Sequence, residues 1–204
     1  MPLPVAEIAK LVASDAYRAD PTVVNEALEI LAKTPGFIAA WHGLEIQDPQ
    51  YLYAVILWES VEHHRALIAD QVAYPAIGEK MRKVSNGRVW LYHVHFNAEV
   101  DKALNAPTTE LALMTVKDSV ETSQYLETAK TIVPQIYSTL PNEVFEGGWG
   151  PTVENDRKFM ICLGWHSVER FFAAFKGAPE LFARITALKE LSEVDLRHAK
   201  LTKY

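Results

Sequence analysis

A five-residue motif occurs twice in this chain, and the repetition constrains the fold more than any other feature of the sequence. Trp58–Glu62 reads WESVE, and Trp165–Glu169 reads WHSVE. Each copy follows an apolar run of the kind that forms buried strands and precedes a run with helical spacing. Serine at an N-cap followed by glutamate in the first turn favours a helix start. A strand–cap–helix unit present twice indicates an internal duplication.

The residues around the first motif predict the order β-α-β-β-α-β. Pro35-Gly36 ends the first helix, Tyr74-Pro75 breaks the second helical segment, and Asn86-Gly87 is expected as a turn. Residue alternation and helical spacing place strands at 5–12, 37–46, 52–57 and 89–96. The predicted helices run from 22 to Pro35-Gly36, over 61–68, and from the break at Tyr74-Pro75 to 81.

The residues around the second motif predict the same order again. Pro134 lies inside a helical pattern and is expected to kink or split that helix. The predicted strands cover 111–116, 144–153, 159–165 and 195–203, and the predicted helices cover 120–140, 168–175 and 178–191. Two such units predict an α+β fold made of two ferredoxin-like halves.

Each predicted sheet has helices on one face only, so its other apolar face requires a partner. We therefore expect the two tandem halves to pack sheet-to-sheet as an intramolecular α+β barrel with a cavity between the sheets. The expected boundaries are 1–98 for the first half, 99–109 for a linker and 110–204 for the second half.

Composition excludes several classes of protein. A net charge of -6 argues against electrostatic binding of nucleic acid, because such binding needs clustered lysine and arginine. No apolar run of about 18 residues and no signal peptide are recognisable, so no membrane association is expected. The single cysteine, Cys162, excludes an internal disulfide framework and suits a reducing compartment, so the sequence predicts a cytoplasmic protein.

Several stretches resemble the antibiotic-biosynthesis-monooxygenase-like branch of the dimeric α+β barrel superfamily: Pro35–Phe37, Asp48-Pro49, Trp58–Glu62 and Tyr92–Val94. The second half keeps the motif at Trp165–Glu169 but lacks Pro-Gly before its second strand. Most members of this family build the barrel from two chains, so the resemblance implies that a tandem copy is a monomer or a weak homodimer. The family includes cofactor-free monooxygenases, haem-degrading enzymes, isomerases and proteins of no assigned activity, so the reaction stays open.

Histidines are the candidate catalytic residues. His93 and His95 lie two apart on a predicted strand and therefore share a face, which we expect to point into the cavity. His93 is the candidate general base, because the family's cofactor-free reactions begin by deprotonating a phenol-like substrate, and polar lining is the alternative. His42 is a candidate second polar contact, and the resemblance places it near His198. No metal is expected, because no carboxylate or cysteine is spaced to complete a ligand set.

Tryptophans are the candidate substrate-binding residues. Trp58 and Trp165 occupy equivalent strand ends, where they either border the cavity or anchor the core. Trp41 and Trp149 are expected beside the cavity and could plug it. The adjacent histidines His63 and His64 are interpreted as structural. No cofactor is expected, and haem is disfavoured because the family's haem-degrading branch carries a histidine in a region that corresponds here to 68–74, which has none.

The sequence thus favours a small-molecule enzyme that acts on a hydrophobic, aromatic or polyketide-like substrate. The expected chemistry is cofactor-independent oxygenation or histidine-assisted proton transfer, as in an isomerase or cyclase. The alternative is a non-catalytic ligand-binding or stress-associated barrel protein. Whether the chain is an enzyme, and which half carries the function, stay open from sequence.

Overall fold

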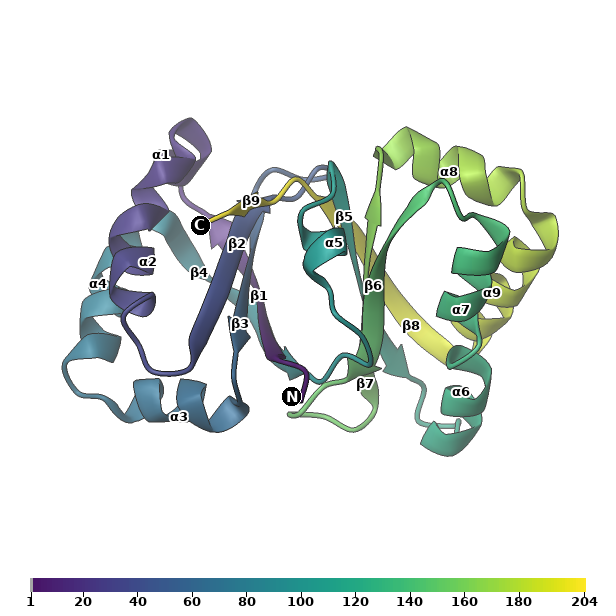
Figure 1. The fold of residues 1–204 in the computed structure, drawn as a ribbon, viewed down its shortest axis with the longest axis horizontal. Helices are drawn as coiled ribbons and strands as arrows, with labels where there is room; N and C mark the ends of the chain where they lie inside the picture. Colours follow the sequence, from purple (N-terminus) through teal and green to yellow (C-terminus); the bar gives the residue numbers. More distant parts are fainter. Residues whose placement is uncertain (1) are drawn as a thin grey trace. The chain divides into compact units, whose positions relative to one another are not determined.

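The computed structural model describes residues 2–204 and divides the chain into two compact units (Figure 1). One unit comprises the chain up to His95 together with Ala199–Tyr204, and the other comprises Phe96–His198. Each unit is a mixed α+β structure in which helices pack on one face of a sheet. The predicted α+β class is confirmed.

The first unit contains a five-stranded sheet in the order β4-β1-β3-β2-β9, in which every pairing of neighbouring strands is antiparallel. Apolar side chains from β1, β2 and β3 meet residues of the helices in one core. The strands are β1 (Val5–Ala13), β2 (Phe37–Leu44), β3 (Tyr51–Trp58), β4 (Ser85–Val94) and β9 (Thr202–Lys203), and the helices are α1 (Asp15–Ala19), the 3-10 helix η1 (Pro21–Val24), α2 (Asn25–Leu31), α3 (Val61–Ala69) and α4 (Ala73–Val84).

The second unit contains a four-stranded sheet in the order β6-β7-β5-β8. Its core joins β5 and β7 to the helices that follow them in the chain. The strands are β5 (Thr108–Val116), β6 (Val144–Pro151), β7 (Lys158–Trp165) and β8 (Ser192–Ala199), and the helices are α5 (Asp101–Leu104), α6 (Thr122–Ala129), α7 (Ile132–Thr139), α8 (Val168–Lys176) and α9 (Pro179–Leu191).

Two prolines lie at helix starts rather than at helix breaks. The helix predicted over 120–140 is split as expected, but the split lies before Ile132, and Pro134 falls in the first turn of α7. The predicted break at Tyr74-Pro75 is wrong in the same way, because α4 begins at Ala73 and contains both residues in its first turn. The first turn leaves its N–H groups without partners in the helix, so proline costs little there.

Two other differences concern a predicted turn and a predicted linker. Asn86-Gly87, predicted as a turn, belongs to β4, where the register with β1 shifts by a bulge. The segment 99–109, expected as a linker, contains α5 and the first residues of β5, and Ala103 and Leu104 are buried.

The last predicted strand is in fact two strands. β8 belongs to the second sheet, whereas β9 pairs with β2 through Trp41 opposite Lys203 and His42 opposite Thr202. His42, which the resemblance places near His198, thus pairs with Thr202, four residues further along the chain. Gly43 permits this approach, because a Cβ atom added there would lie 1.9 Å from the Lys200 carbonyl oxygen.

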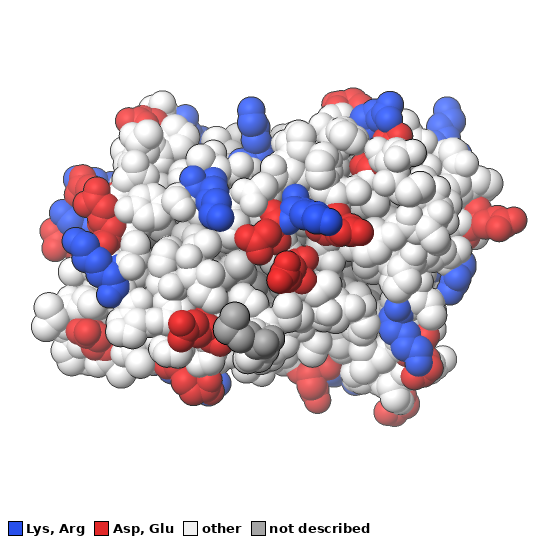
Figure 2. Space-filling view, in the orientation of Figure 1, with Lys and Arg blue, Asp and Glu red and all other residues white. Residues whose placement is uncertain are grey.

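On the face that Figure 2 shows, basic and acidic side chains are interspersed rather than gathered by sign. Within residues 2–204, no helix has the length and apolar character that a membrane crossing needs.

Replacing Gly43 by alanine should destabilise the protein by about 1–3 kcal/mol, because the added methyl group overlaps a backbone oxygen that cannot rotate away. Gly78→Ala is the matched control. Nothing lies within 4 Å of its Cβ position on α4, so that variant should gain about 0.4–1 kcal/mol. Urea unfolding of both variants measures the difference, and equal stability of Gly43→Ala and the wild type would contradict the close approach.

Candidate functional site

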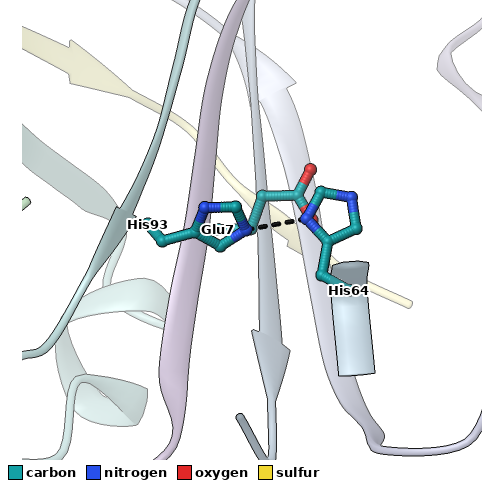
Figure 3. Close-up of side chains that lie close together, drawn as sticks. All are labelled: Glu7, His64 and His93. Atoms are coloured by element: carbon teal, nitrogen blue, oxygen red, sulfur yellow. Dashed lines mark hydrogen bonds and ion pairs between the residues drawn. The ribbon is translucent and has the colours of Figure 1, made fainter. Parts of the chain in front are cut away.

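Three ionisable side chains meet on the helix-covered face of the first sheet: Glu7, His64 and His93 (Figure 3). Glu7 lies on β1 directly opposite His93 on β4, and His64 comes from α3. Each of the three is only 6% exposed. Buried ionisable groups are expensive unless they contact one another, so this cluster is the strongest candidate site in the first unit.

The repeated motif places His64 in the cluster. Trp58 is the last residue of β3 and Ser60 is the N-cap of α3, so His64 lies one turn into the helix. Helical side chains lean back toward the N-terminus, which brings the imidazole over the indole of Trp58. The two rings stack with centroids 5.2 Å apart and planes 13° apart.

Hydrogen bonds and short polar contacts join the cluster into a chain. The Trp58 Nε1–H donates to Oε2 of Glu7 at 2.8 Å, and Nδ1 of His64 lies 3.3 Å from the same oxygen. Nδ1 of His64 also lies 2.7 Å from Nε2 of His93, so one of these two nitrogens carries the shared hydrogen. The arrangement can hold a proton between two imidazoles beside a carboxylate. It therefore provides the proton donor and acceptor that general acid–base catalysis needs.

The second unit repeats this arrangement with one change. The Trp165 Nε1–H donates to Oε2 of Glu110 at 2.6 Å, as Trp58 does to Glu7. Phe171 takes the place of His64, with ring centroids 5.1 Å from Trp165 and 4.8 Å from His198. The second unit therefore keeps the tryptophan–glutamate pair and one histidine but has a phenyl ring between them.

Burial controls the ionisation of the polar groups in the second unit. Desolvation raises the pKa of Glu110 to about 7, although the hydrogen bond from Trp165 favours the carboxylate. Desolvation also lowers the pKa of His198 to about 4. At neutral pH the site therefore carries a neutral imidazole and a carboxyl group near half-ionisation.

The predicted orientation of His93 is wrong. We expected it to face away from the helices, but its partner His64 lies on α3, and its neighbour Leu91 packs against the helix-side core. Trp90 instead lies on the opposite face, where it contacts Tyr53. Strand alternation separates the two faces correctly but does not say which of them the helices cover.

The other predicted histidines are not in the cluster. His95 lies beyond the end of β4 and is exposed. His42 is buried on β2, and its Nδ1 lies 2.7 Å from the hydroxyl of Tyr17 on α1. Desolvation lowers the pKa of His42.

The four predicted tryptophans are core residues to different degrees. Trp58 and Trp165 are completely buried, and each anchors a glutamate. Trp41 is buried under the ammonium of Lys203, which lies 5.0 Å from the ring centroid. Trp149 is half-buried and packs against the core of the second unit.

Sequence reasoning missed Glu7 and His64. The statement that no carboxylate is placed to join the histidines is wrong, because the pairing of β1 with β4 brings Glu7 to His93. A signal was available: Glu7-Ile8-Ala9 and Glu110-Leu111-Ala112 are similar and each contains a charged residue within an apolar strand. An alignment of the two halves would have exposed this pair.

A groove lies beside α3 in the first unit. It encloses about 510 Å³, and its lining includes Ile30 of α2, Pro35, Ala73, and the α3 residues His63 and Leu67. His63 directly precedes His64 and Leu67 follows it by three residues, so the helix that supplies His64 also lines the groove. This volume suits a small organic molecule.

Comparison of the sequence with family models and with curated proteins finds no match. Solved structures with the same fold do exist. A candidate monooxygenase from Fusobacterium nucleatum is 12% identical, with a TM-score of 0.73 over 99% of this chain and 94% of that one. An anthrone oxidase-like protein is 11% identical, with a TM-score of 0.70 over 98% and 91%. A candidate chlorite dismutase is 9% identical, with a TM-score of 0.61 over 99% and 96%.

These similarities confirm the predicted resemblance at the level of the fold. Nearly the whole chain shares the α+β fold of these solved structures. Identities of 9–12% carry no information on the reaction, so the function has to be argued from the side chains.

Ionisation of Glu110 should destabilise the folded protein. Its carboxyl binds a proton more tightly in the folded state, with a pKa of about 7, than at the ordinary value of 4.5. Wild type should therefore lose stability relative to Glu110→Gln as pH rises from about 4.5 to about 7, by about 3 kcal/mol in all. His198 is the same in both proteins, so its own pH dependence cancels.

Chemical unfolding at several pH values measures this difference. Glutamine still accepts the hydrogen bond from Trp165, so the variant should fold. The control is Glu193→Gln on β8, which makes the same chemical change at an exposed carboxyl. A difference between wild type and Glu110→Gln that stays flat across this range would contradict the proposed ionisation.

Proposed function

We propose that the chain is a small-molecule enzyme whose reactive site is the Glu7–His64–His93 cluster of the first unit. The observation that carries the proposal is the contact between two buried imidazole nitrogens, 2.7 Å apart, beside a carboxylate. The substrate class is a hydrophobic aromatic compound with an acidic hydrogen, such as a phenol or an anthrone. The anthrone oxidase-like protein that shares the fold supports this choice of probe.

The proposed reaction begins with removal of a proton from the substrate by the histidine pair. Glu7 favours the imidazolium that results, because an opposite charge close by stabilises it. An anthrone carbanion can then react with dioxygen, so that one anthrone and one O₂ give one anthraquinone and one water. Dioxygen is the oxidant, and the protein supplies the base and the position of the substrate.

Two features of the first unit support the proposal. The groove along α3 offers about 510 Å³ next to the helix that carries His64. The second unit has Phe171 in place of His64 and so lacks the imidazole pair. We therefore assign the reaction to the first unit alone.

The proposal includes no haem, although the family that the sequence resembles includes haem-degrading enzymes. Nδ1 of His64 and Nε2 of His93 are directed at each other inside the core. The segment 68–74, where the resemblance implies a haem ligand, contains no histidine.

A second function has one observation in its favour. The cluster is enclosed on nearly all sides, which also suits a structural polar network in a non-catalytic ligand-binding protein. In that case the groove would hold a ligand without converting it.

Replacing His93 by asparagine should lower the rate of anthrone oxidation at least about 100-fold, because the proton acceptor is lost. The matched control is His198→Asn in the second unit, which should keep the wild-type rate. Oxygen uptake and anthraquinone formation measure the rate, and circular dichroism checks that both variants fold.

Wild-type protein that oxidises neither anthrones nor phenols, yet retains a small molecule in native mass spectrometry, would favour the non-catalytic function. Equal rates for folded His93→Asn and wild type would remove the proposed base.

A further inference from the structure

We propose that Glu7, His64 and His93 also form a binding site for a divalent first-row transition-metal ion, with Zn²⁺ as the representative. Each of the three residues offers one ligand atom, and these atoms all lie within 4.8 Å of one another. The set consists of two imidazole nitrogens and one carboxylate oxygen, which suit zinc, iron and cobalt far better than calcium or magnesium.

The distances fit an ion after a small adjustment. A metal about 2.1 Å from each ligand separates neighbouring ligands by about 3.0 Å in octahedral and about 3.4 Å in tetrahedral geometry. Nδ1 of His64 lies 3.3 Å from Oε2 of Glu7 and 2.7 Å from Nε2 of His93. The two imidazoles must separate by a few tenths of an ångström, which a small rotation about χ1 or χ2 supplies, and the ligand atoms of Glu7 and His93 lie within 4.8 Å of each other.

The scaffold holds the three ligands on separate elements. β1 and β4 are paired strands, so Glu7 and His93 keep their spacing, and α3 brings His64 in from the helix layer. The indole N–H of Trp58 donates to the Glu7 carboxylate and orients it, as outer hydrogen bonds do in known metal sites. Three protein ligands leave coordination positions open for water or a small molecule, unlike a closed structural zinc site.

The corresponding residues of the second unit do not make a complete ligand set. Glu110, Trp165 and His198 repeat the other members of the arrangement, but Phe171 stands where His64 would complete the set. Two ligands bind such ions weakly, so the expected stoichiometry is one ion per chain.

Metal binding and the proposed proton transfer exclude each other. An ion occupies the nitrogen lone pairs that would otherwise accept a proton from the substrate. The metal site goes beyond the proposed function, and its test needs no substrate, so failure of one leaves the other untouched.

The experiment titrates the full-length, untagged and metal-stripped protein with ZnCl₂ in a calorimeter, and with CoCl₂ while visible absorption is recorded. Wild type should bind one ion per chain, and cobalt should give absorption bands of a site with nitrogen and oxygen ligands. His64→Phe copies the second unit and should weaken binding more than about 100-fold, which is more than loss of an outer hydrogen bond costs.

Two further variants make the result decisive. His166→Ala removes an exposed histidine outside the cluster and should bind zinc as wild type does. Glu7→Gln still accepts the hydrogen bond from Trp58 but loses the negative charge, so it should also weaken zinc binding. This variant tests the proposal if His64→Phe does not fold. Any of three results would overturn the proposal. Wild type could bind zinc no more tightly than folded His64→Phe does, or Glu7→Gln could bind zinc as tightly as wild type. The third result is that His166→Ala loses as much zinc affinity as His64→Phe.

Discussion

The hydrogen bond from a buried indole to a buried glutamate is the constraint on which both units depend. Trp58 closes β3 and donates to Glu7 on β1, and Trp165 closes β7 and donates to Glu110 on β5. In each unit the bond joins the two neighbouring central strands below the first turn of a helix. A glutamate in an apolar layer is unstable without such a donor, so the tryptophan cannot be replaced by another large apolar residue at no cost. This explains why the repeated motif begins with tryptophan rather than with phenylalanine.

The two units differ at one position of the arrangement that they share. The second unit packs Phe171 against Trp165 and His198, which is the simpler solution for a core. The first unit has His64 at that place and joins it to His93 and Glu7. Putting a second imidazole into a core adds desolvation cost without adding apolar packing. An arrangement that costs stability and occurs in one copy only is typical of a functional site.

Much of the fold could be predicted from the sequence, and the site could not. Local patterns determine strands and helices, so the order of elements in both halves was correct. Proline was misinterpreted at Pro75 and Pro134 because the same residue both breaks a helix and starts one. Glu7 was missed because it joins His93 only through the pairing of the first and last strands of the half, which no local pattern reveals. His64 was interpreted as structural because its neighbours in the sequence give no sign of its neighbours in space.

The short strand β9 belongs to the first unit, although it follows the whole second unit in the chain. The first sheet ends in β2, whose outer edge is covered by Thr202–Lys203. A ribosome makes those residues only after it has made the whole second unit. Until then the edge of β2 exposes unsatisfied backbone groups, a state in which sheets recruit foreign strands. The amino-terminal unit therefore completes its sheet last, although it is translated first.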